Sequence, residues 1–255
     1  MYLIKRIDFL LSLIGLNPIK FVKSFFLFPR YFQDWRRFKS KTDWRIEFHP
    51  RLYDATVQAG TLGEYFWQDT HVAGKIIQSN VTTHIDVGSR IDGFIAIVAS
   101  SRHVEVFDIR PLNVQIPNVR FHQWDMTIPS EQREVADSVS CLHTLEHVGL
   151  GRYSDPIDPD GWKNALLNLI ALLKQGGTLW LSVPVGIERV EFNAHRVFSP
   201  FTISKFLHSN GMELLEFAYV DNGLHVSTDA QKDMLRLHEK GYALGIFCYR
   251  KQGSL

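Results

Sequence analysis

A short glycine turn with acidic residues on both sides has the composition of a nucleoside-binding site. Residues 86–93 read DVGSRIDG and follow a β-rich run at residues 83–87. A glycine turn between a strand and a helix points backbone N–H groups at a ligand. About 20 residues later, Asp108 ends the next predicted strand, where a carboxylate can accept both hydroxyls of a ribose. Asp125 and Met126 follow the third predicted strand, where this arrangement contacts an adenine ring.

The turn departs from the dinucleotide-binding pattern. In GxGxxG the second glycine lets the backbone approach a pyrophosphate, but Arg90 stands at that position here. S-adenosylmethionine carries no phosphate, and the carboxylate of Asp86 could balance its ammonium group. We therefore expect S-adenosylmethionine as the cofactor, and not NAD. The expected cofactor-binding residues are Asp86, Gly88, Ser89, Gly93, Asp108, Asp125, Met126 and His143.

A histidine-rich segment, residues 143–147 (HTLEH), follows the fourth predicted strand. Its HxxEH pattern is that of inverted zinc peptidases, in which both histidines lie on one face of a helix. Here the segment begins at the end of a strand and no third ligand is apparent, so we expect no peptidase and assign no metal ligand. Glu146 or His147 could deprotonate a substrate hydroxyl, or both could be structural residues beneath the site. In a third alternative, these two side chains and His143 help to hold a divalent metal.

A second candidate base, His195, lies in the long loop after the fifth predicted strand. That loop and the strand-four loop flank one crevice in a sheet of this kind, and a neutral imidazole near pH 7 suits removal of a hydroxyl proton. The expected catalytic residues are Glu146, His147 and His195. The residues expected to contact substrate are Asp69, Asp155, Asp158 and Arg196. A structural role stays open for the arginine and for the loop at 153–160, which lacks the spacing of an EF-hand.

The elements that would bring these residues together are strands and helices in alternation. Strands are predicted near residues 83–87, 103–107, 118–122, 138–142, 178–183, 213–220 and 242–249. Helices are predicted from about residue 63, over 94–99, 160–174 and 200–209, and weakly at 234–238. In the helix at 160–174, Asp160 is expected to cap the start, Lys174 to lie in the last turn and Gly176 to end it. The alternation indicates an α/β fold with a mostly parallel seven-stranded sheet and a final antiparallel strand.

The first 45 residues differ in charge from the rest of the chain. They hold ten Lys or Arg against three Asp or Glu, with 11 of the 32 aromatic residues, whereas the remainder holds 18 against 24. We expect a helical, basic and aromatic extension over residues 1–62 and an α/β domain over 63–255. The two widely spaced cysteines, Cys141 and Cys248, exclude a disulfide framework or a zinc ribbon and suit a reducing cytoplasm.

The extension could lie on a membrane, but its uncharged stretches are too short to cross one. Its longest uncharged stretch, residues 9–19, has 11 residues, whereas a spanning helix needs about 20. Aromatic residues alternate with Lys and Arg between residues 20 and 39, which suits a helix in the headgroup zone. Alternatively, the aromatic residues pack on the domain as a lid. We expect one of these two roles and not a grip on nucleic acid.

Across about residues 80–250 the chain resembles the class I S-adenosylmethionine-dependent methyltransferases, through the turn at 86–93 and the acidic residues after the next two strands. It is more closely similar to an uncharacterised methyltransferase-like family found in nematodes and in bacterial surface-polysaccharide gene clusters. The segments YFWQD (65–69), GRYSDPIDPDG (151–161) and NAHRVFSP (193–200) carry this closer likeness. LEHV at 145–148 resembles the same position in ubiquinone-type O-methyltransferases, some of which use a divalent metal there. The resemblance implies a Rossmann-like fold and methyl transfer from S-adenosylmethionine.

The function favoured by these observations is O-methylation of a sugar, such as a nucleotide- or lipid-linked intermediate of polysaccharide biosynthesis. The polysaccharide context comes from the resemblance alone. One alternative is a methyltransferase-like binding or assembly protein without catalysis. Another is a nucleic-acid methyltransferase, although no Asn/Asp-Pro-Pro-Tyr/Phe motif is present. We expect a cytoplasmic enzyme with peripheral contact to the inner membrane face through residues 1–45, and no oligomeric state is predicted.

Overall fold

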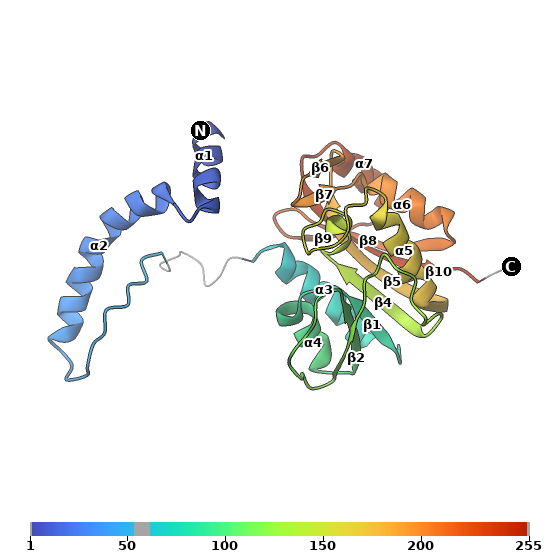
Figure 1. Ribbon diagram of the computed structural model, residues 1–255, viewed down its shortest axis with the longest axis horizontal. Coiled ribbons are helices and arrows are strands. Elements are labelled where there is room, and N and C mark those ends of the chain that lie inside the picture. Colours follow the sequence, from blue (N-terminus) through green and yellow to red (C-terminus); the bar gives the residue numbers. More distant parts are fainter. Residues whose placement is uncertain (1, 54–61, 254–255) are drawn as a thin grey trace. The chain divides into compact units, whose positions relative to one another are not determined.

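The computed structural model describes residues 2–53 and 62–253, and the chain divides into two units, Met1–Thr61 and Leu62–Leu255 (Figure 1). Part of the predicted extension, residues 1 and 54–61, lies outside the described residues. Each unit is described by itself below.

The second unit is built on an eight-stranded sheet with the strand order β3-β2-β1-β4-β5-β10-β8-β9. The strands are β1 (His84–Val87), β2 (Val104–Asp108), β3 (Val119–Gln123), β4 (Ala136–Leu142), β5 (Leu173–Val185), β8 (Met212–Val220), β9 (Leu224–Val226) and β10 (Ala243–Lys251). Strands β1 to β5 pair in parallel, and β10 is antiparallel to both β5 and β8. The predicted parallel sheet with an antiparallel last strand is therefore confirmed. The short edge strand β9, antiparallel to β8, adds to the seven strands that we expected.

Helices flank this sheet, as Figure 1 shows. They are α3 (Glu64–Gln78), a π-helical turn (Ile91–Ile95) that continues into α4 (Ala96–Ala99), a 3₁₀ turn (Leu145–His147), α5 (Gly161–Leu172), α6 (Pro200–Ser209) and α7 (Ala230–His238). A small hairpin of β6 (Arg189–Glu191) and β7 (His195–Val197) interrupts the connection from β5 to α6. Because β1 to β4 are parallel, the loops after them emerge at one edge of the sheet, where the predicted site residues lie.

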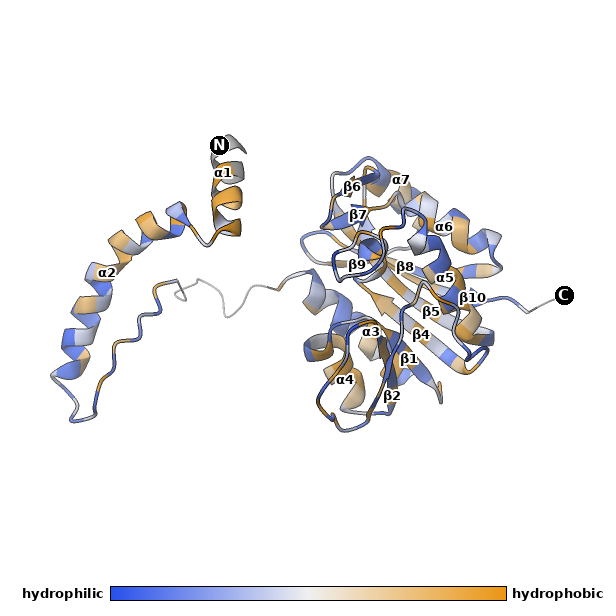
Figure 2. Ribbon diagram, in the orientation of Figure 1, coloured by the Kyte–Doolittle hydropathy of each residue, from blue (hydrophilic) through white to orange (hydrophobic). Residues whose placement is uncertain are grey.

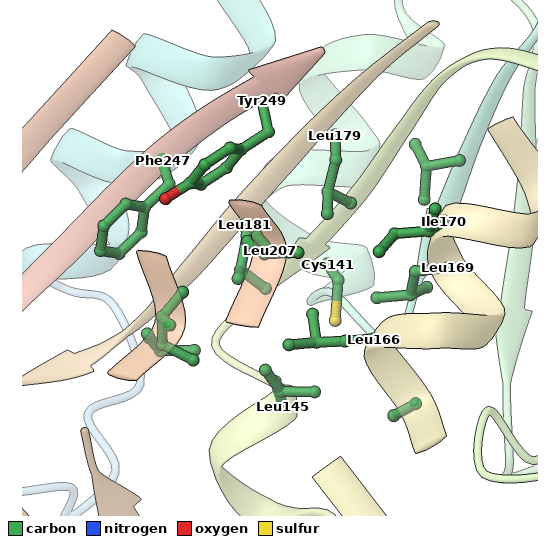
Figure 3. Close-up of a cluster of buried hydrophobic side chains, with 14 of the residues drawn as sticks. Cys141, Leu145, Leu166, Leu169, Ile170, Leu179, Leu181, Leu207, Phe247 and Tyr249 are labelled. Carbon is green, nitrogen blue, oxygen red and sulfur yellow. The ribbon is translucent and has the colours of Figure 1, made fainter. Parts of the chain in front are cut away.

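Two apolar clusters cover the two faces of the sheet. Alternate residues of β5 divide between them: Leu179 and Leu181 pack in the cluster with α5, whereas Trp180 packs in the cluster with α3 and α4. Figure 3 shows Leu166 and Leu169 of α5 facing the strand residues of the first cluster. This double cover leaves the central strands β1 and β4 almost wholly buried.

The helix predicted over residues 160–174 ends earlier than expected. Helix α5 stops at Leu172, and Lys174 lies in β5, where its Nζ donates to Asp137 Oδ1 at 2.7 Å. The chain must extend there because Leu173 pairs with Ala136 of β4, so Gly176 does not end a helix. Asp160 occupies the N-cap position but makes no capping hydrogen bond. Its carboxylate pairs instead with the Lys163 ammonium at 2.7 Å.

The first unit is helical, as predicted for the extension. It contains α1 (Tyr2–Leu13) and α2 (Pro18–Lys39), and the side chain of Asn17 caps α2 by accepting from the backbone of Lys20 at 3.0 Å. Within this unit, the rings of Phe28, Phe32 and Phe48 stack, yet no residue of α2 is buried. Among the described residues, no helix is long and apolar enough to cross a membrane.

Candidate cofactor cleft and active site

A first cleft opens where β1, β2, β3 and β4 end. Five of the eight predicted cofactor residues line it, namely Gly88, Asp108, Asp125, Met126 and His143. The structure thus brings together residues spread over more than 50 positions of the sequence.

The glycine turn after β1 fits tightly against the loop after β4. Gly88 adopts a φ of 75°, and a Cβ there would lie 2.4 Å from Thr144 Cγ2. The Thr144 hydroxyl donates to the Gly88 carbonyl at 2.8 Å. Only glycine satisfies both the backbone angle and the space at this position.

Asp86 fixes this turn from below and does not face the cleft. Its side chain is fully buried and accepts hydrogen bonds from Ser89 N (3.1 Å), Ser89 Oγ (2.6 Å) and Ser140 Oγ (2.5 Å). Burial raises the pKa of Asp86 to about 7. Leu142 N donates to Ser89 Oγ at 3.1 Å, which joins the turn to β4. In this place the carboxylate holds the turn in shape, whereas we had expected it to balance a ligand ammonium.

Gly93 also lies away from the cleft, against α3. A Cβ at Gly93 would lie 2.3 Å from Asp69 Oδ2, so the two residues predicted for cofactor and substrate pack on each other. Asp69 is buried, accepts from Gln68 Nε2 at 2.8 Å, and has a pKa raised by burial. Among the residues described, neither Gly93 nor Asp69 lines the clefts of the site.

Asp108 ends β2 with its carboxylate in the first cleft, but an arginine already binds it. Arg110 donates from Nε to Asp108 Oδ1 at 3.0 Å and from Nη2 to Oδ2 at 2.9 Å. Its backbone N–H also reaches Oδ1 at 2.8 Å. A ribose that took both oxygens would have to displace the guanidinium, although the backbone bond could persist.

The far wall of the first cleft comes from the loop after β3. Asp125 Oδ1 accepts from Thr127 N at 2.9 Å and from Thr127 Oγ1 at 2.8 Å, which fixes the loop. Met126 is buried, and its carbonyl accepts from Asn168 of α5 at 2.9 Å. The cleft wall therefore offers an apolar thioether beside a carboxylate, which suits the face and the amino edge of an adenine.

A second, more polar cleft continues from the first, since Gly88, Asp108, His143 and His147 line both. Ser89, Glu146 and His195 line the second cleft. The structure therefore gathers all three predicted catalytic residues beside the expected cofactor residues.

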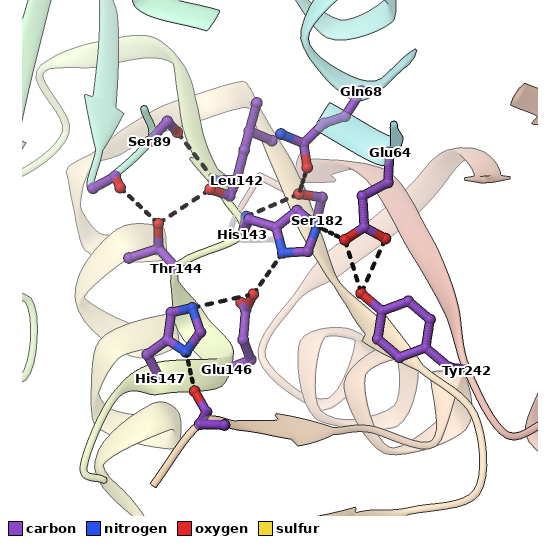
Figure 4. A network of polar contacts seen from close by, with 12 residues as sticks. Glu64, Gln68, Ser89, Leu142, His143, Thr144, Glu146, His147, Ser182 and Tyr242 are labelled. Carbon is purple, nitrogen blue, oxygen red and sulfur yellow. Dashed lines mark hydrogen bonds and ion pairs between the residues drawn. The ribbon is translucent and has the colours of Figure 1, made fainter. Parts of the chain in front are cut away.

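His143 stands at the centre of a network of carboxylates (Figure 4). Its Nδ1 lies 2.7 Å from Glu146 Oε1, and its Nε2 lies 3.4 Å from Glu64 Oε1. The Tyr242 hydroxyl donates to Glu64 at 3.0 Å. The backbone of His143 has a φ of 53°, and its backbone N–H donates to Ser182 Oγ at 3.0 Å. This bond fixes the backbone that carries the ring.

The network fixes the charge of His143. Burial alone would lower the pKa of its imidazole, but the contacts with Glu146 and Glu64 outweigh burial and raise the pKa to about 9. Glu64 has a lowered pKa: burial opposes ionisation, and the contacts with His143 and Tyr242 prevail. His143 is therefore a cation at neutral pH and cannot act as a base there.

His147 has the opposite character. Burial lowers its pKa, so the ring is neutral near pH 7. Its Nδ1 lies 2.7 Å from the carbonyl of Ala194, which can only accept, and 3.2 Å from Nη1 of Arg152, which can only donate. The shorter contact favours a proton on Nδ1. Nε2 then holds a lone pair, 3.6 Å from Glu146 Oε1. A proton taken up at Nε2 would gain this carboxylate as its counter-ion, which suits a general base.

His195 lies on β7, in the wall of the second cleft, with Nε2 at 3.7 Å from Glu191 Oε2. No hydrogen bond within the described structure reaches its buried Nε2, and the same holds for Glu146 Oε2. Both residues line the second cleft. His195 therefore stays a candidate contact to substrate.

Arg196 and the acidic loop have structural contacts. Arg196 is buried and donates to the carbonyls of Val148 and, at 3.3 Å, Pro159. Asp155 accepts from the backbone of Gly149 at 2.7 Å and lines the first cleft. Asp158 accepts from the backbone of Asp160 at 2.9 Å. These groups hold the loop in shape, which is the structural alternative that the sequence left open.

No group of three or more His, Cys, Asp or Glu side chains with a geometry that could hold a metal occurs within residues 2–53 and 62–253. The third alternative for the HTLEH segment therefore has no support from the side-chain geometry, in which Glu146 binds His143.

Sequence reasoning missed Glu64, Tyr242, Arg110 and Arg152, all of which line the second cleft. Glu64 and Tyr242 stand 178 positions apart and meet only because α3 and β10 approach the same end of the sheet. The position of Arg110, two residues after Asp108, was the one local signal that could have been used.

Solved structures with the same architecture decide the fold. The cyclase SpnF is 14% identical, with a TM-score of 0.52 over 72% of this chain and 81% of that chain. The N-methyltransferase NodS of Bradyrhizobium japonicum, solved with S-adenosylhomocysteine, is 11% identical, with a TM-score of 0.52 over 74% and 89%. A 1,6-didemethyltoxoflavin-N1-methyltransferase of Burkholderia thailandensis is 15% identical, with a TM-score of 0.51 over 74% and 79%.

Residues 62–255 have the Rossmann-like methyltransferase fold. Residues 118–240 also match a family described as a Caenorhabditis protein of unknown function, DUF268. This match covers just under half of the chain and is consistent with the nematode branch of the expected resemblance. The search of curated proteins found no sequence match. In the methyltransferase fold, ligands bind where the two clefts lie, at the carboxyl ends of the parallel strands.

The raised pKa of His143 predicts a loss of stability at alkaline pH. The folded-state pKa of about 9 exceeds the ordinary value of 6.5, so the stabilisation is complete below about pH 6.5 and disappears as the pH rises through 9. By NMR titration we expect the His143 ring to titrate near pH 9, and at a clearly lower pH in Glu64→Gln. Glu188→Gln, an exposed control, should leave the midpoint unchanged. A midpoint near 6.5 in the unsubstituted protein would contradict the assigned network.

Proposed function

We propose that the chain is an S-adenosylmethionine-dependent methyltransferase. The observation that carries this proposal is the first cleft, in which Gly88, Asp108 and the pair Asp125–Met126 stand at the ends of three consecutive parallel strands. That order suits the methionine end, the ribose and the adenine of one ligand. Two proteins with this fold, NodS and the didemethyltoxoflavin methyltransferase, were solved with S-adenosylhomocysteine bound.

The residues present fit this cofactor. Gly88 and Thr144 line the first cleft beside Asp108, whose carboxylate offers two acceptor oxygens for vicinal hydroxyls. Met126 would pack on the adenine while Asp125 accepts from its amino group. A dinucleotide fits less well, because Arg90 stands at the second-glycine position of a pyrophosphate-binding turn.

The second cleft can prepare an acceptor hydroxyl. We propose His147 as the general base: Nε2 takes the hydroxyl proton while Ala194 holds Nδ1–H and Glu146 receives the new imidazolium as a partner. S-adenosylmethionine, when bound, supplies a methyl group activated by its sulfonium. Cationic His143 keeps Glu146 in place and contributes no lone pair. Positioning by His195 and the walls of the cleft completes the arrangement.

We propose a sugar or glycan intermediate as the acceptor, methylated on oxygen. The second cleft supports this class because histidine, carboxylate, tyrosine and arginine side chains line it, which together can hydrogen-bond to hydroxyls of several orientations. The two cysteines are buried and unpaired, which suits the cytoplasm as the place of this reaction.

One observation favours a second candidate, a protein that uses the fold for another purpose. SpnF, a protein with this fold, is described as a cyclase, and here Arg110 already occupies the carboxylate that a ribose needs. Saturable cofactor binding without methyl transfer to any hydroxylated acceptor would support that candidate.

Replacing Asp108 tests the cofactor site. We expect Asp108→Ala to weaken binding of S-adenosylhomocysteine by about 10- to 100-fold, since hydrogen bonds to a charged acceptor contribute about 1.5–3 kcal/mol. Calorimetric titration measures this, and circular dichroism confirms that the variant is folded. Asp160→Ala, an exposed carboxylate outside both clefts, is the matched control and should bind normally. Equal affinity in a folded Asp108→Ala variant would remove the assigned site.

Replacing His147 separates proton transfer from cofactor binding. In a methyl-transfer assay against nucleotide-linked and lipid-linked sugars, we expect His147→Ala to lower kcat by at least about 100-fold. The dissociation constant of S-adenosylhomocysteine should change by less than about threefold, because the ring contributes only one edge of the first cleft. His225→Ala, a histidine outside both clefts, is the control. Unchanged turnover in His147→Ala would show that the base is another group.

A further inference from the structure

Two arginines approach one tyrosine ring at the border of the clefts. The guanidinium carbon of Arg110 lies 4.8 Å from the centroid of the Tyr153 ring, and that of Arg152 lies 5.3 Å from it. Tyr153 is held by Asp155, whose Oδ1 accepts from its backbone N–H at 3.0 Å. The loop thus fixes an aromatic platform that brings two cationic groups to one place.

Arg152 has no carboxylate partner among the ion pairs of the described residues. It is exposed, lines the second cleft and donates to the carbonyl of Ala194 at 2.7 Å. A guanidinium has five N–H donors in a planar fork, and this contact uses few of them. Its remaining donors can bind an oxyanion in the second cleft.

Arg110 is paired, but with the carboxylate that the cofactor needs. Its fork takes both oxygens of Asp108, and its side chain is 57% exposed. The carboxylate of this pair is only 16% exposed, so the partner that a ribose would displace is the exposed guanidinium, which can move into the open cleft. Ribose hydroxyls carry no charge, so the displaced guanidinium would lose its counter-ion beside Arg152.

We propose that Arg110 and Arg152 form an anion subsite for the acceptor, completed when the cofactor ribose takes Asp108 from Arg110. The subsite would bind a phosphate group carried by the acceptor, since two guanidinium forks match phosphate oxygens in geometry and charge. This inference rests on the proposed cofactor and names the charge class of the acceptor. It makes cofactor and acceptor bind cooperatively, because each ligand favours the same displaced state of Arg110.

Calorimetric titration of the full chain with inorganic pyrophosphate tests the subsite. We expect saturating S-adenosylhomocysteine to tighten pyrophosphate binding by at least about tenfold. Arg110→Ala and Arg152→Ala should each abolish this gain, and Arg110→Ala should still bind S-adenosylhomocysteine at least as tightly as the unsubstituted chain. Arg133→Ala, an exposed arginine outside both clefts, should keep the gain.

The outcomes separate the two proposals. Binding of S-adenosylhomocysteine with no change in pyrophosphate affinity overturns the anion subsite and leaves the proposed function standing. A gain that persists in both arginine variants also overturns the subsite. No binding of S-adenosylhomocysteine overturns the cofactor and the subsite together.

A separate observation concerns the first unit, where large apolar side chains are exposed along α1 and the start of α2. Their exposed fractions lie between 55% and 77%, for Phe9, Leu10, Leu13, Ile14, Leu16, Phe21, Val22, Phe25 and Phe26. Figure 2 shows this hydrophobic stretch on α1 and the first half of α2. An exposed apolar surface of this extent marks an interaction site.

The same part of α2 carries a cationic side. With 3.6 residues per turn, Lys23 and Arg30 fall on the side opposite Phe21 and Phe25, and Phe26 lies next to this cationic side. The whole helix contains six Lys or Arg and one acidic residue, Asp34. An apolar side flanked by positive charge complements a bilayer with anionic headgroups, because the rings enter the acyl boundary while the cations meet the phosphates.

We propose that α1 and α2 lie flat on an anionic bilayer surface. Co-sedimentation of the full chain with phosphatidylcholine vesicles containing about 30% phosphatidylserine should show binding that weakens as salt rises. Phe25→Glu combined with Phe26→Glu should weaken it at least tenfold. Leu235→Glu, at an exposed apolar residue of α7, should not.

Two results would overturn the membrane proposal. The first is equal sedimentation of the double variant and the unsubstituted chain. The second is no binding of the unsubstituted chain to anionic vesicles, which would leave the exposed face to a protein partner.

Discussion

The buried carboxylate of Asp86 joins the glycine turn to strand β4, and both clefts depend on this connection. It binds Ser89 of the glycine turn and Ser140 of β4, while Thr144 closes over Gly88 from the other side. A carboxylate without these donors would be costly at a fully buried position. The turn and the strand-four loop therefore form one rigid unit, and the first cleft inherits its shape from it.

The fold could be predicted from the sequence because its signals are local. Short β-rich runs predicted the strands, apolar periodicity predicted the helices, and the alternation of the two predicted a parallel sheet with covered faces. The predicted end of the helix at residues 160–174 was wrong because two interactions favour a strand there. Lys174 bonds to Asp137, and β5 pairs with β4 from Leu173 onward. The edge strand β9 has only three residues, too few to show a period in the sequence.

The site could be predicted only in part. Gly88, Asp108 and Asp125 follow predicted strands, so their meeting at one edge was foreseeable. The contact between Glu64 and Tyr242 was not, since no local pattern links residues so far apart. Nor could the sequence distinguish the two histidines of the HTLEH segment. Their environments make His143 a cation and leave His147 neutral, and that difference assigns the roles.

The central claim is that the first cleft holds the nucleoside end of S-adenosylmethionine. Amide NMR spectra of the full chain, recorded during titration with S-adenosylhomocysteine, test it most directly because they report both binding and place. The account predicts saturable shifts concentrated at Gly88, Asp108, Asp125 and Met126. A folded protein whose spectrum does not change, or changes away from these residues, would contradict it.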